Sequence, residues 1–213
     1  KEDIRIAVAQ NANDQAETVL FRLLRGTGTD GLAGIAYERE ERGYKVIRPL
    51  LDVYRDEIER YCDYNGLRPR IDHTNMETIY SRNKIRNELI PYIEKEYNGN
   101  IMESMVRLAR IAAADKEYMW QQAEKEYRRL ATENIEDRVV TMEREKLAAL
   151  HEAVRHRVML KAFAAIGLES DISEERIKAA DSIIEKKQGA KTVQFPRGYT
   201  LTVAKGVVMV KYL

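Results

Sequence analysis

Residues 4–31 place a strand, a polar turn and a helix in immediate succession, and this run constrains the fold more than any other part of the chain. Residues 4–9, "IRIAVA", are apolar and partly β-branched, which is typical of a buried strand. Asn13 or Asp14 is the expected N-cap of a helix over residues 14–25, with Glu17 completing a capping box. The apolar positions with helical spacing are Ala16, Val19, Leu20, Leu23 and Leu24. A strand, a turn and a helix form half of a βαβ unit, so the run predicts an α/β fold.

The turn between this strand and this helix is a candidate ligand site, because ligands of open α/β sheets bind where strands end and helices begin. The polar residues there are Gln10, Asn11, Asn13 and Asp14. Amides can hydrogen-bond a base or a ribose, and Asp14 can hold Mg²⁺ through water or accept from a substrate amine. Arg22 and Arg25 lie off the apolar stripe, where we expect them to be free for anions.

A structural interpretation of the same residues stands beside the functional one. Asn and Asp before a helix are usually caps, and glycines after a helix, here Gly26, Gly28 and Gly31, are usually turns. The motif by itself favours this structural interpretation.

The rest of the chain is predicted to be mostly helical, with strands at its end. Expected helices cover residues 53–64 (capped by Asp52), 79–97 (interrupted at Pro91), 100–131, 143–149, 151–166 and 173–187. Residues 132–138 are expected to be a linker before a short strand at 139–142. The tail predicts three short strands with turns at Pro196–Gly198 and at Lys205–Gly206.

Charge and cysteine content narrow the classes of function. Lys and Arg number 36 against 35 Asp and Glu, so a nucleic acid would have to bind a local basic patch. The single cysteine, Cys62, excludes a disulfide or a CxxC site within the chain and fits a reducing cytoplasm, which is the predicted location. No segment approaches the roughly 20 apolar residues of a membrane span.

Three blocks of the sequence resemble one enzyme family. "NANDQAETVLFRLLRGTGTDGL" (residues 11–32) is similar to the second motif of the tRNA(Ile)-lysidine synthetases of the PP-loop, or N-type ATP pyrophosphatase, superfamily. That motif reads His-His-x-Asp-Asp-Gln-Ala-Glu-Thr, a Leu-rich helix, then Arg-Gly. "RPLLDVYRDEIERYC" (residues 48–62) and "YSRNKIRNELIPYIE" (residues 80–94) match two later blocks, the last with Tyr80, Arg82, Asn83, Arg86, Glu88, Leu89 and Pro91 in place. The resemblance covers residues 4–97 and is looser beyond them.

The resemblance implies a fold and a reaction. The fold would be the C-terminal part of a PP-loop α/β nucleotide-binding domain (1–97), a long connecting helix (98–131) and a small α+β substrate- or tRNA-binding domain ending in a β-meander (132–213). The family uses ATP, with Mg²⁺, to adenylate the wobble cytidine of a CAU-anticodon tRNA(Ile), and free lysine then displaces AMP. A homodimer is left open.

The resemblance also implies roles for individual residues. It makes Asp14 and Arg82 catalytic, and it makes Asn11, Asn13, Glu17, Arg25, Asn83 and Arg86 substrate-binding. Arg82 and Arg86 stand four residues apart, so one helix face could carry both to a phosphate. Their structural alternative is an exposed face paired with Glu88.

Two departures from the family pattern limit what this chain is expected to do. The Ser-Gly-Gly-x-Asp-Ser loop, which holds pyrophosphate in the family, would lie upstream of Lys1. We therefore expect residues 1–213 alone to bind ATP and Mg²⁺ weakly and not to complete the reaction. Gln10 and Asn11 replace the paired histidines and Asn13 replaces the first Asp, which puts a general base at those positions in doubt.

The remaining candidate residues each have a functional and a structural interpretation. Arg107, Arg110, Arg128 and Arg129 are the predicted tRNA-binding residues, although the glutamates among them equally fit a solvated helix face. His73, His151 and His156 do not have zinc-site spacing, and no metal site is predicted. Tyr118 and Trp120 follow the apolar period and are expected to pack rather than to stack on a base.

Two other functions remain open. A non-catalytic tRNA- or partner-binding module is favoured if the phosphate loop is truly missing. A tRNA thiolase of the same superfamily is disfavoured, because those enzymes generally use CxxC cysteines.

Overall fold

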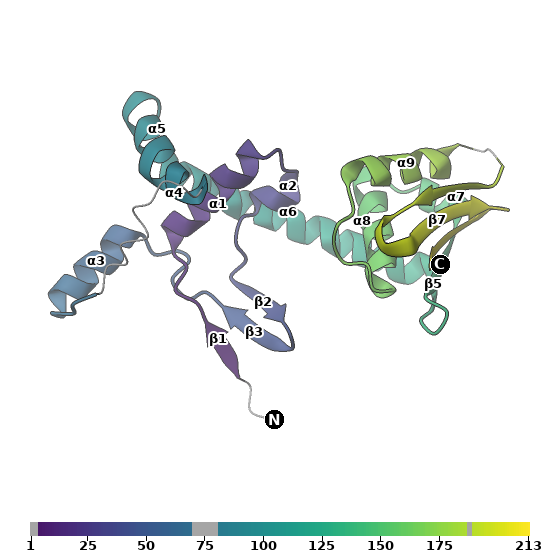
Figure 1. The fold of residues 1–213 in the computed structure, drawn as a ribbon, viewed down its shortest axis with the longest axis horizontal. Helices are drawn as coiled ribbons and strands as arrows, with labels where there is room; N and C mark the ends of the chain where they lie inside the picture. The colour runs from purple at the N-terminus through teal and green to yellow at the C-terminus, as the bar shows by residue number, and fades with distance from the viewer. Residues whose placement is uncertain (1–3, 70–80, 187–188) are drawn as a thin grey trace. The chain divides into compact units, whose positions relative to one another are not determined.

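The structure, a computed structural model, describes residues 4–69, 81–186 and 189–213. Its contacts divide the chain into two units, Lys1–Lys116 and Glu117–Leu213, and each unit has its own sheet (Figure 1). Helix α6 (Ile101–Leu130) is the element that contributes residues to both.

The sheet of the first unit is formed around a parallel pair. β1 (Arg5–Ala7) pairs in parallel with β3 (Tyr44–Ile47), and β2 (Glu38–Glu41) pairs antiparallel with the other edge of β3. Two helices, α1 (Ala12–Leu24) and α2 (Thr29–Leu32), connect β1 to β2. The parallel pair with a helical connection confirms the predicted α/β character of this segment.

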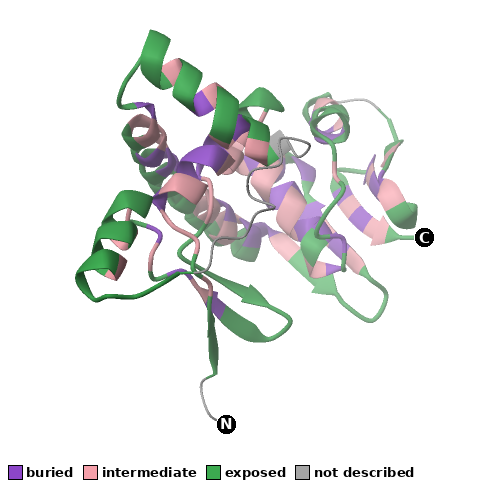
Figure 2. Cartoon of the chain, turned by 60° about the vertical axis from the view of Figure 1, so that its left-hand side comes forward, coloured by how far each residue is buried: buried purple, intermediate pink, exposed green. Residues whose placement is uncertain are grey.

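Residues 4–9 are expected to form a buried strand. The structure has a strand there, but the expectation that this strand is buried is wrong. All three residues of β1 are exposed, as Figure 2 shows for most of this sheet. Ile6 and Val8 line an open cavity instead of a packed layer, so water reaches a strand whose sequence is apolar.

Helices pack around α1 and form the small core of the first unit. They are α4 (Ser81–Lys84), a π-helix η2 (Ile85–Leu89), α5 (Ile90–Glu96) and the start of α6, whereas α3 (Arg55–Tyr64) has no buried residue. One apolar cluster joins Leu20 of α1 to Ile85, Ile90 and Ile101, and a second joins Ala12 and Ala16 of α1 to Val106 of α6. α1 is therefore held on two sides, which fixes the orientation of its polar face.

Two local predictions about this unit need correction. The predicted helix at 79–97 is interrupted by the π-helix rather than at Pro91, which lies in the first turn of α5, where a missing N–H costs little. Asp52 does not cap α3. The cap is Tyr54, whose backbone N–H donates to Glu57, while Asp52 accepts from Tyr37 (2.5 Å) and Arg110 (3.0 Å).

The second unit has the α+β character that the resemblance implies, with helices packed on an antiparallel sheet. Its five-stranded antiparallel sheet has the order β4-β5-β8-β7-β6. The strands are β4 (Ala131–Asn134), β5 (Val139–Glu143), β6 (Lys191–Gln194), β7 (Tyr199–Ala204) and β8 (Val207–Tyr212), with a 3₁₀ turn η3 (Pro196–Gly198) before β7. The helices are α7 (Arg144–Ala148), α8 (Glu152–Ala165) and α9 (Glu174–Glu185). The three predicted strands of the tail and both predicted turns are confirmed.

The core of the second unit is larger than that of the first. Phe163 of α8, Ile184 of α9 and Leu201 of β7 are among its fully buried side chains, and the second half of α6 adds Ala123, Tyr127 and Leu130. The predicted linker at 132–138 is wrong in part, because β4 pairs with β5 and leaves only the hairpin turn irregular. In the parts of the chain that the structure describes, no helix has the length and apolar content to cross a membrane.

Candidate active site

The N-terminus of α1 fixes Asp14 through a capping box. Asn11 is the N-cap, and its side-chain oxygen accepts from the backbone N–H of Asp14 (3.1 Å). One carboxylate oxygen of Asp14 accepts in return from the backbone N–H of Asn11 (3.0 Å). The capping box is thus one turn earlier than the Asp14–Glu17 pair that the sequence predicts, and Glu17 is left free to face another element.

Glu17 receives two arginines in a buried position. Its side chain is 1% exposed. Arg86 donates to both of its oxygens, from Nε at 2.5 Å and from Nη2 at 2.9 Å, and Arg82 donates from Nε at 3.1 Å. Arg82 and Arg86 also reach the second carboxylate oxygen of Asp14, at 3.2 and 3.4 Å.

We call Asp14, Glu17, Arg82 and Arg86 the acid–arginine cluster. Its formal charges balance, and the hydrogen bond that Arg86 donates to Glu17 raises the pKa of Arg86 although burial lowers it. The structure therefore brings together both predicted catalytic residues and two of the predicted substrate-binding residues. The structure does not show the alternative, in which the two arginines pair with Glu88. Glu88 lines a different cavity.

The two arginines come from a segment that changes its helical type. Arg82 belongs to α4 and Arg86 to the π-helix η2. A π-helix is rare and is found frequently at functional sites, because its wider turn displaces the following side chains. Both guanidinium groups lie on one side of this segment and pair with Glu17, whereas the four-residue spacing was interpreted as directing them to a phosphate.

The glycine loop after α1 is tied down by side chains of that helix. Gln15, which is buried, accepts from the backbone N–H of Ile35 (2.6 Å) and donates to its carbonyl (3.0 Å). Arg22 donates to the carbonyls of Gly31 (3.0 Å) and Gly34 (2.6 Å). The expectation that Arg22 is free for anions is therefore wrong in part, because loop carbonyls occupy donors of its guanidinium.

Gly34→Ala is expected to lower the free energy of unfolding of the first unit by about 2–3 kcal/mol. Gly34 has a φ of +63°, and a Cβ there would lie 2.3 Å from the side-chain oxygen of Gln15. Gly43→Ala is the matched control, because Gly43 has a φ of +80° with no atom within 4 Å of its Cβ position. The control is expected to cost about 1 kcal/mol in urea unfolding. Equal losses would show that the contact with Gln15 has no importance.

A cavity of about 860 Å³ borders the acid–arginine cluster. Thr18 and Arg82 line it on the cluster side, and Gly34 lines it on the side of the glycine loop. Arg48, directly after β3, also lines it and is 6% exposed. The sequence showed Arg48 only as the first residue of a matching block, since nothing in one sequence distinguishes a buried arginine from an exposed one.

The remaining predicted substrate-binding residues lie elsewhere or serve the fold. Asn11 is used as the N-cap, and the side chain of Asn13 accepts from the backbone N–H of Arg55 (2.9 Å), which holds the start of α3. Asn83 is half-buried on α4.

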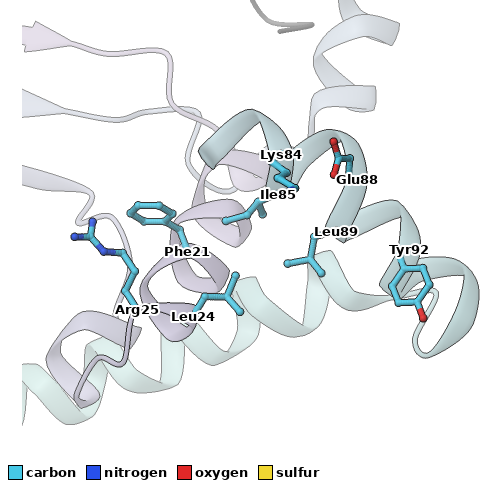
Figure 3. A pocket seen from close by; sticks show the side chains of 8 residues that line it. All are labelled: Phe21, Leu24, Arg25, Lys84, Ile85, Glu88, Leu89 and Tyr92. Atoms are coloured by element: carbon cyan, nitrogen blue, oxygen red, sulfur yellow. The ribbon is translucent and has the colours of Figure 1, made fainter. Parts of the chain in front are cut away.

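Arg25 lies beside a second, mostly apolar cavity of about 1060 Å³. Figure 3 shows it there, next to the ring of Phe21, with the guanidinium carbon 5.1 Å from the ring centroid. The acid–arginine cluster does not include it.

Three of the four predicted tRNA-binding arginines form exposed ion pairs within their own unit. Arg110 pairs with Asp52 (3.0 Å), Arg128 with Glu124 (2.5 Å) and Arg129 with Glu126 (2.5 Å). Such pairs contribute little to stability and exchange readily with other ions. Arg107 is exposed on α6.

The histidines of the second unit and Trp120 have structural partners. His151 caps α8, and the Nε2 atom of His156 lies 3.1 Å from Asp181 and 3.8 Å from Glu152. Arg157 lies over the ring of Trp120, at 5.9 Å from its centroid. Tyr118 is exposed, so the expectation that it packs is wrong. His73 and Tyr80 lie outside the described residues.

Comparison with known proteins shows that the cluster lies in a segment that resembles one domain family. Residues 2–93 match the model of the PP-loop domain family, which includes every residue of the acid–arginine cluster and Arg48. The chain is 40% identical over 195 residues to the tRNA(Ile)-lysidine synthase of Clostridioides difficile, covering 91% of this chain and 41% of the relative. The corresponding synthase of Clostridium acetobutylicum is 39% identical over 196 residues, covering 90% and 40%.

A third such relative, from Clostridium perfringens, is 38% identical over 204 residues, covering 96% of this chain. The chain spans about two fifths of the length of these curated relatives. Residues 2–93 are therefore similar to the PP-loop domain family, and over about nine tenths of its length the chain is similar to the bacterial tRNA(Ile)-lysidine synthases.

Proposed function

We propose that this chain acts in a tRNA(Ile)-lysidine synthetase, an ATP-dependent ligase that joins lysine to the wobble cytidine of a CAU-anticodon tRNA(Ile). The intermediate is a cytidine adenylated on its C2 oxygen. The observation that carries the proposal is the acid–arginine cluster at the border of a cavity, in a chain whose relatives bear that name. The cytoplasm is the proposed location.

The cluster has the chemistry that an amino-acid substrate requires. Free lysine carries two ammonium groups and a carboxylate, and the cluster offers two carboxylates and two guanidinium groups. Asp14 is the proposed acceptor for a lysine amine, because its carboxylate is partly exposed while that of Glu17 is buried. Arg82, the more exposed arginine, is proposed to contact phosphate oxygens of the adenylate.

Neither carboxylate of this cluster is available to Mg²⁺ without sharing its oxygens with hydrogen-bond donors. The carboxylates of Asp14 and Glu17 both accept hydrogen bonds from guanidinium groups, and Asp14 accepts another from Asn11. The cluster residues therefore do not fit a directly bound divalent cation in this arrangement, and their proposed roles are binding and orientation alone.

The test measures incorporation of radiolabelled lysine into a tRNA(Ile) transcript by the protein as its gene encodes it. Asp14→Asn and Arg82→Gln are each expected to lower the rate at least about tenfold, the cost of one charged contact. Glu40→Gln on exposed β2 is the matched control and is expected to leave the rate unchanged. Unchanged rates in both cluster variants would contradict the proposed roles of Asp14 and Arg82.

A binding module without catalysis is the second candidate. It is favoured by Gln10 and Asn11, which stand where the family has histidines and cannot act as bases at neutral pH. Saturable tRNA binding without any lysine incorporation by the encoded protein would establish it. For residues 1–213 alone we propose this same behaviour.

A further inference from the structure

Three side chains that can each ligate a metal ion meet between α8 and α9 in the second unit. Glu152 and His156 come from α8 and Asp181 comes from α9, and one ligand atom from each lies within 4.8 Å of the others. We call these residues the α8–α9 triad. The Nε2 atom of His156 lies 3.1 Å from Asp181 and 3.8 Å from Glu152. Two tetrahedral ligands of one Zn²⁺ lie about 3.4 Å apart, so the triad already has nearly the spacing of a coordination shell.

The ring nitrogen of His156 points to a ligand that is not a proton. Its side chain is 19% exposed, and Nε2 itself is shielded from water. Within the described residues, no oxygen is aligned with Nε2 closely enough for a regular hydrogen bond, although Asp181 is near. A hydrogen-bonded proton lies close to the line between its two partners, whereas a metal held equally by both lies well off that line. The misaligned approach therefore suits two ligands of one metal better than a hydrogen-bonded ion pair.

Helical spacing directs two members of the triad to the same side of α8. Glu152 and His156 are four residues apart, which places their side chains one above the other on one helix face. The same spacing lets two side chains of one helix share a zinc ion in the His-Glu-x-x-His pattern. The spacing between the histidines of this chain does not show the site, because the other ligand on α8 is a glutamate and the third ligand belongs to α9.

The charge around the triad favours a cation. Arg155 is the guanidinium beside it, and Arg155 pairs with both Asp181 and Glu185. Together with Glu152, three carboxylates thus face one guanidinium, which leaves a negative excess. Lys178, the neighbouring lysine that interacts with Glu152, is itself paired with a glutamate of α9. A divalent ion would neutralise this excess.

The α8–α9 triad differs from the acid–arginine cluster in its suitability for a metal. It includes an imidazole nitrogen, which Zn²⁺ binds well. Within the described residues, the carboxylate of Glu152 accepts no hydrogen bond, and its only ion pair is with His156. Asp181 does share its oxygens with Arg155, but ligating carboxylates are commonly oriented by such outer donors, and each oxygen has a second lone pair.

We propose that the α8–α9 triad binds one late first-row divalent metal ion, with Zn²⁺ as the ion that fits its donors best. Nε2 of His156 and one oxygen each of Glu152 and Asp181 are the protein ligands, and water completes the shell. Arg155 is the positioning residue for Asp181. The ion joins α8 to α9 and thereby stabilises the second unit. This inference goes beyond the proposed function and does not depend on it.

The experiment titrates residues 1–213, freed of metal with EDTA, with zinc chloride in a calorimeter. Saturable binding at one site is expected. His156→Gln and Glu152→Gln are each expected to weaken binding at least about tenfold, because each removes one ligand. Circular dichroism checks the folding of His156→Gln, while the side chain of Glu152 is 64% exposed and its substitution leaves the core untouched.

A thermal measurement reads the same site through stability. With Zn²⁺ at about 100 times its Kd, the unfolding midpoint reported by Trp120 fluorescence is expected to rise by at least about 5 °C. The rise is expected to disappear after EDTA is added and to be absent from Glu152→Gln. An unchanged midpoint would contradict a metal that joins α8 to α9.

His151→Asn is the matched control for the calorimetry. It removes the other histidine at the start of α8, and an asparagine can replace the cap that His151 provides. Zinc binding is expected to stay unchanged in this variant. The proposal is overturned by the absence of saturable binding, by unchanged affinity in either triad variant, or by an equal loss in His151→Asn. Displacement of Zn²⁺ by an equal concentration of Mg²⁺ would overturn the assignment to a transition metal.

Discussion

Glu17→Gln is expected to lower the free energy of unfolding of the first unit by about 2–4 kcal/mol, toward the cost of breaking a buried ion pair. The carboxylate of Glu17 accepts three hydrogen bonds from Arg82 and Arg86 and is 1% exposed. An amide has one acceptor oxygen and would direct its NH₂ group at arginine donors. The expected loss stays below that of a fully buried pair, because Arg82 is 43% and Arg86 is 32% exposed.

Urea unfolding of the first unit is monitored through hydrogen exchange of the α1 amides. Trp120 fluorescence reports the unfolding of the second unit separately. Glu59→Gln is the matched control, since it removes an exposed ion pair with Arg55 (2.8 Å) from the same unit. That control is expected to cost at most about 0.5 kcal/mol. Similar losses in the two variants would show that the burial of Glu17 does not strengthen its ion pairs.

Arg155→Ala is expected to cost about 3–5 kcal/mol in the second unit, the largest effect predicted for this chain. Arg155 is 3% exposed and holds α8 to α9 by donating from Nε and Nη2 to the two oxygens of Asp181. Its Nη1 also donates to the carbonyls of Ala148 (2.9 Å) and Leu150 (2.8 Å). The substitution leaves a buried carboxylate and two carbonyls without these donors.

Unfolding in urea, followed by Trp120 fluorescence, measures this loss. The double variant Arg155→Met with Asp181→Leu is expected to lose less than the sum of its single variants, because it removes both charges together. Arg197→Ala, whose exposed partner is Asp171, is the control and should change stability little. Additive losses in the double variant would contradict an ion-pair origin of the effect.

Acidification gives a second check on the same pair. Burial raises the pKa of Asp181, but hydrogen bonds from Arg155 and His156 outweigh burial and hold it below the ordinary value of 3.8. Since the folded-state pKa is depressed, the ion pair stabilises the unit above that value and its contribution is lost as the pH falls through the folded-state pKa. The difference in the free energy of unfolding between the Arg155→Ala variant and the unchanged chain should therefore become smaller at low pH.

The elements with strong local signals were predictable from the sequence. The helix at 100–131 and the three final strands follow from apolar periodicity and from turns such as Lys205–Gly206, and the structure has both within a few residues. The matching family blocks assigned Asp14, Glu17, Arg82 and Arg86 to one substrate site, but they did not predict the ion pairs among these four residues. The precise hydrogen bonds of these residues depend on the N-cap at Asn11, whereas the sequence pattern predicts the cap two or three residues later.

The hairpin β2–β3 and the buried Arg48 were not predictable by the same means. β2 reads "EREE", four charged and exposed residues, so neither apolar alternation nor strand propensity indicates it. Its position depends on backbone pairing with β3, which is a tertiary interaction. Arg48 resembles any other arginine in the sequence, and only the packing around Gln10 and Ala36 shows that it is buried.

The order of strands in the second sheet has a consequence for how that unit folds. β4 and β5 form one hairpin, β6 and β7 form another, and β8 lies between β5 and β7 and pairs with both. The first hairpin therefore has no neighbouring strand until β8 pairs with β5. This pairing places Val139 opposite Lys211, which is far along the chain. Closing so long a loop is slow compared with forming either hairpin, so assembly of this sheet is limited by the docking of its central strand.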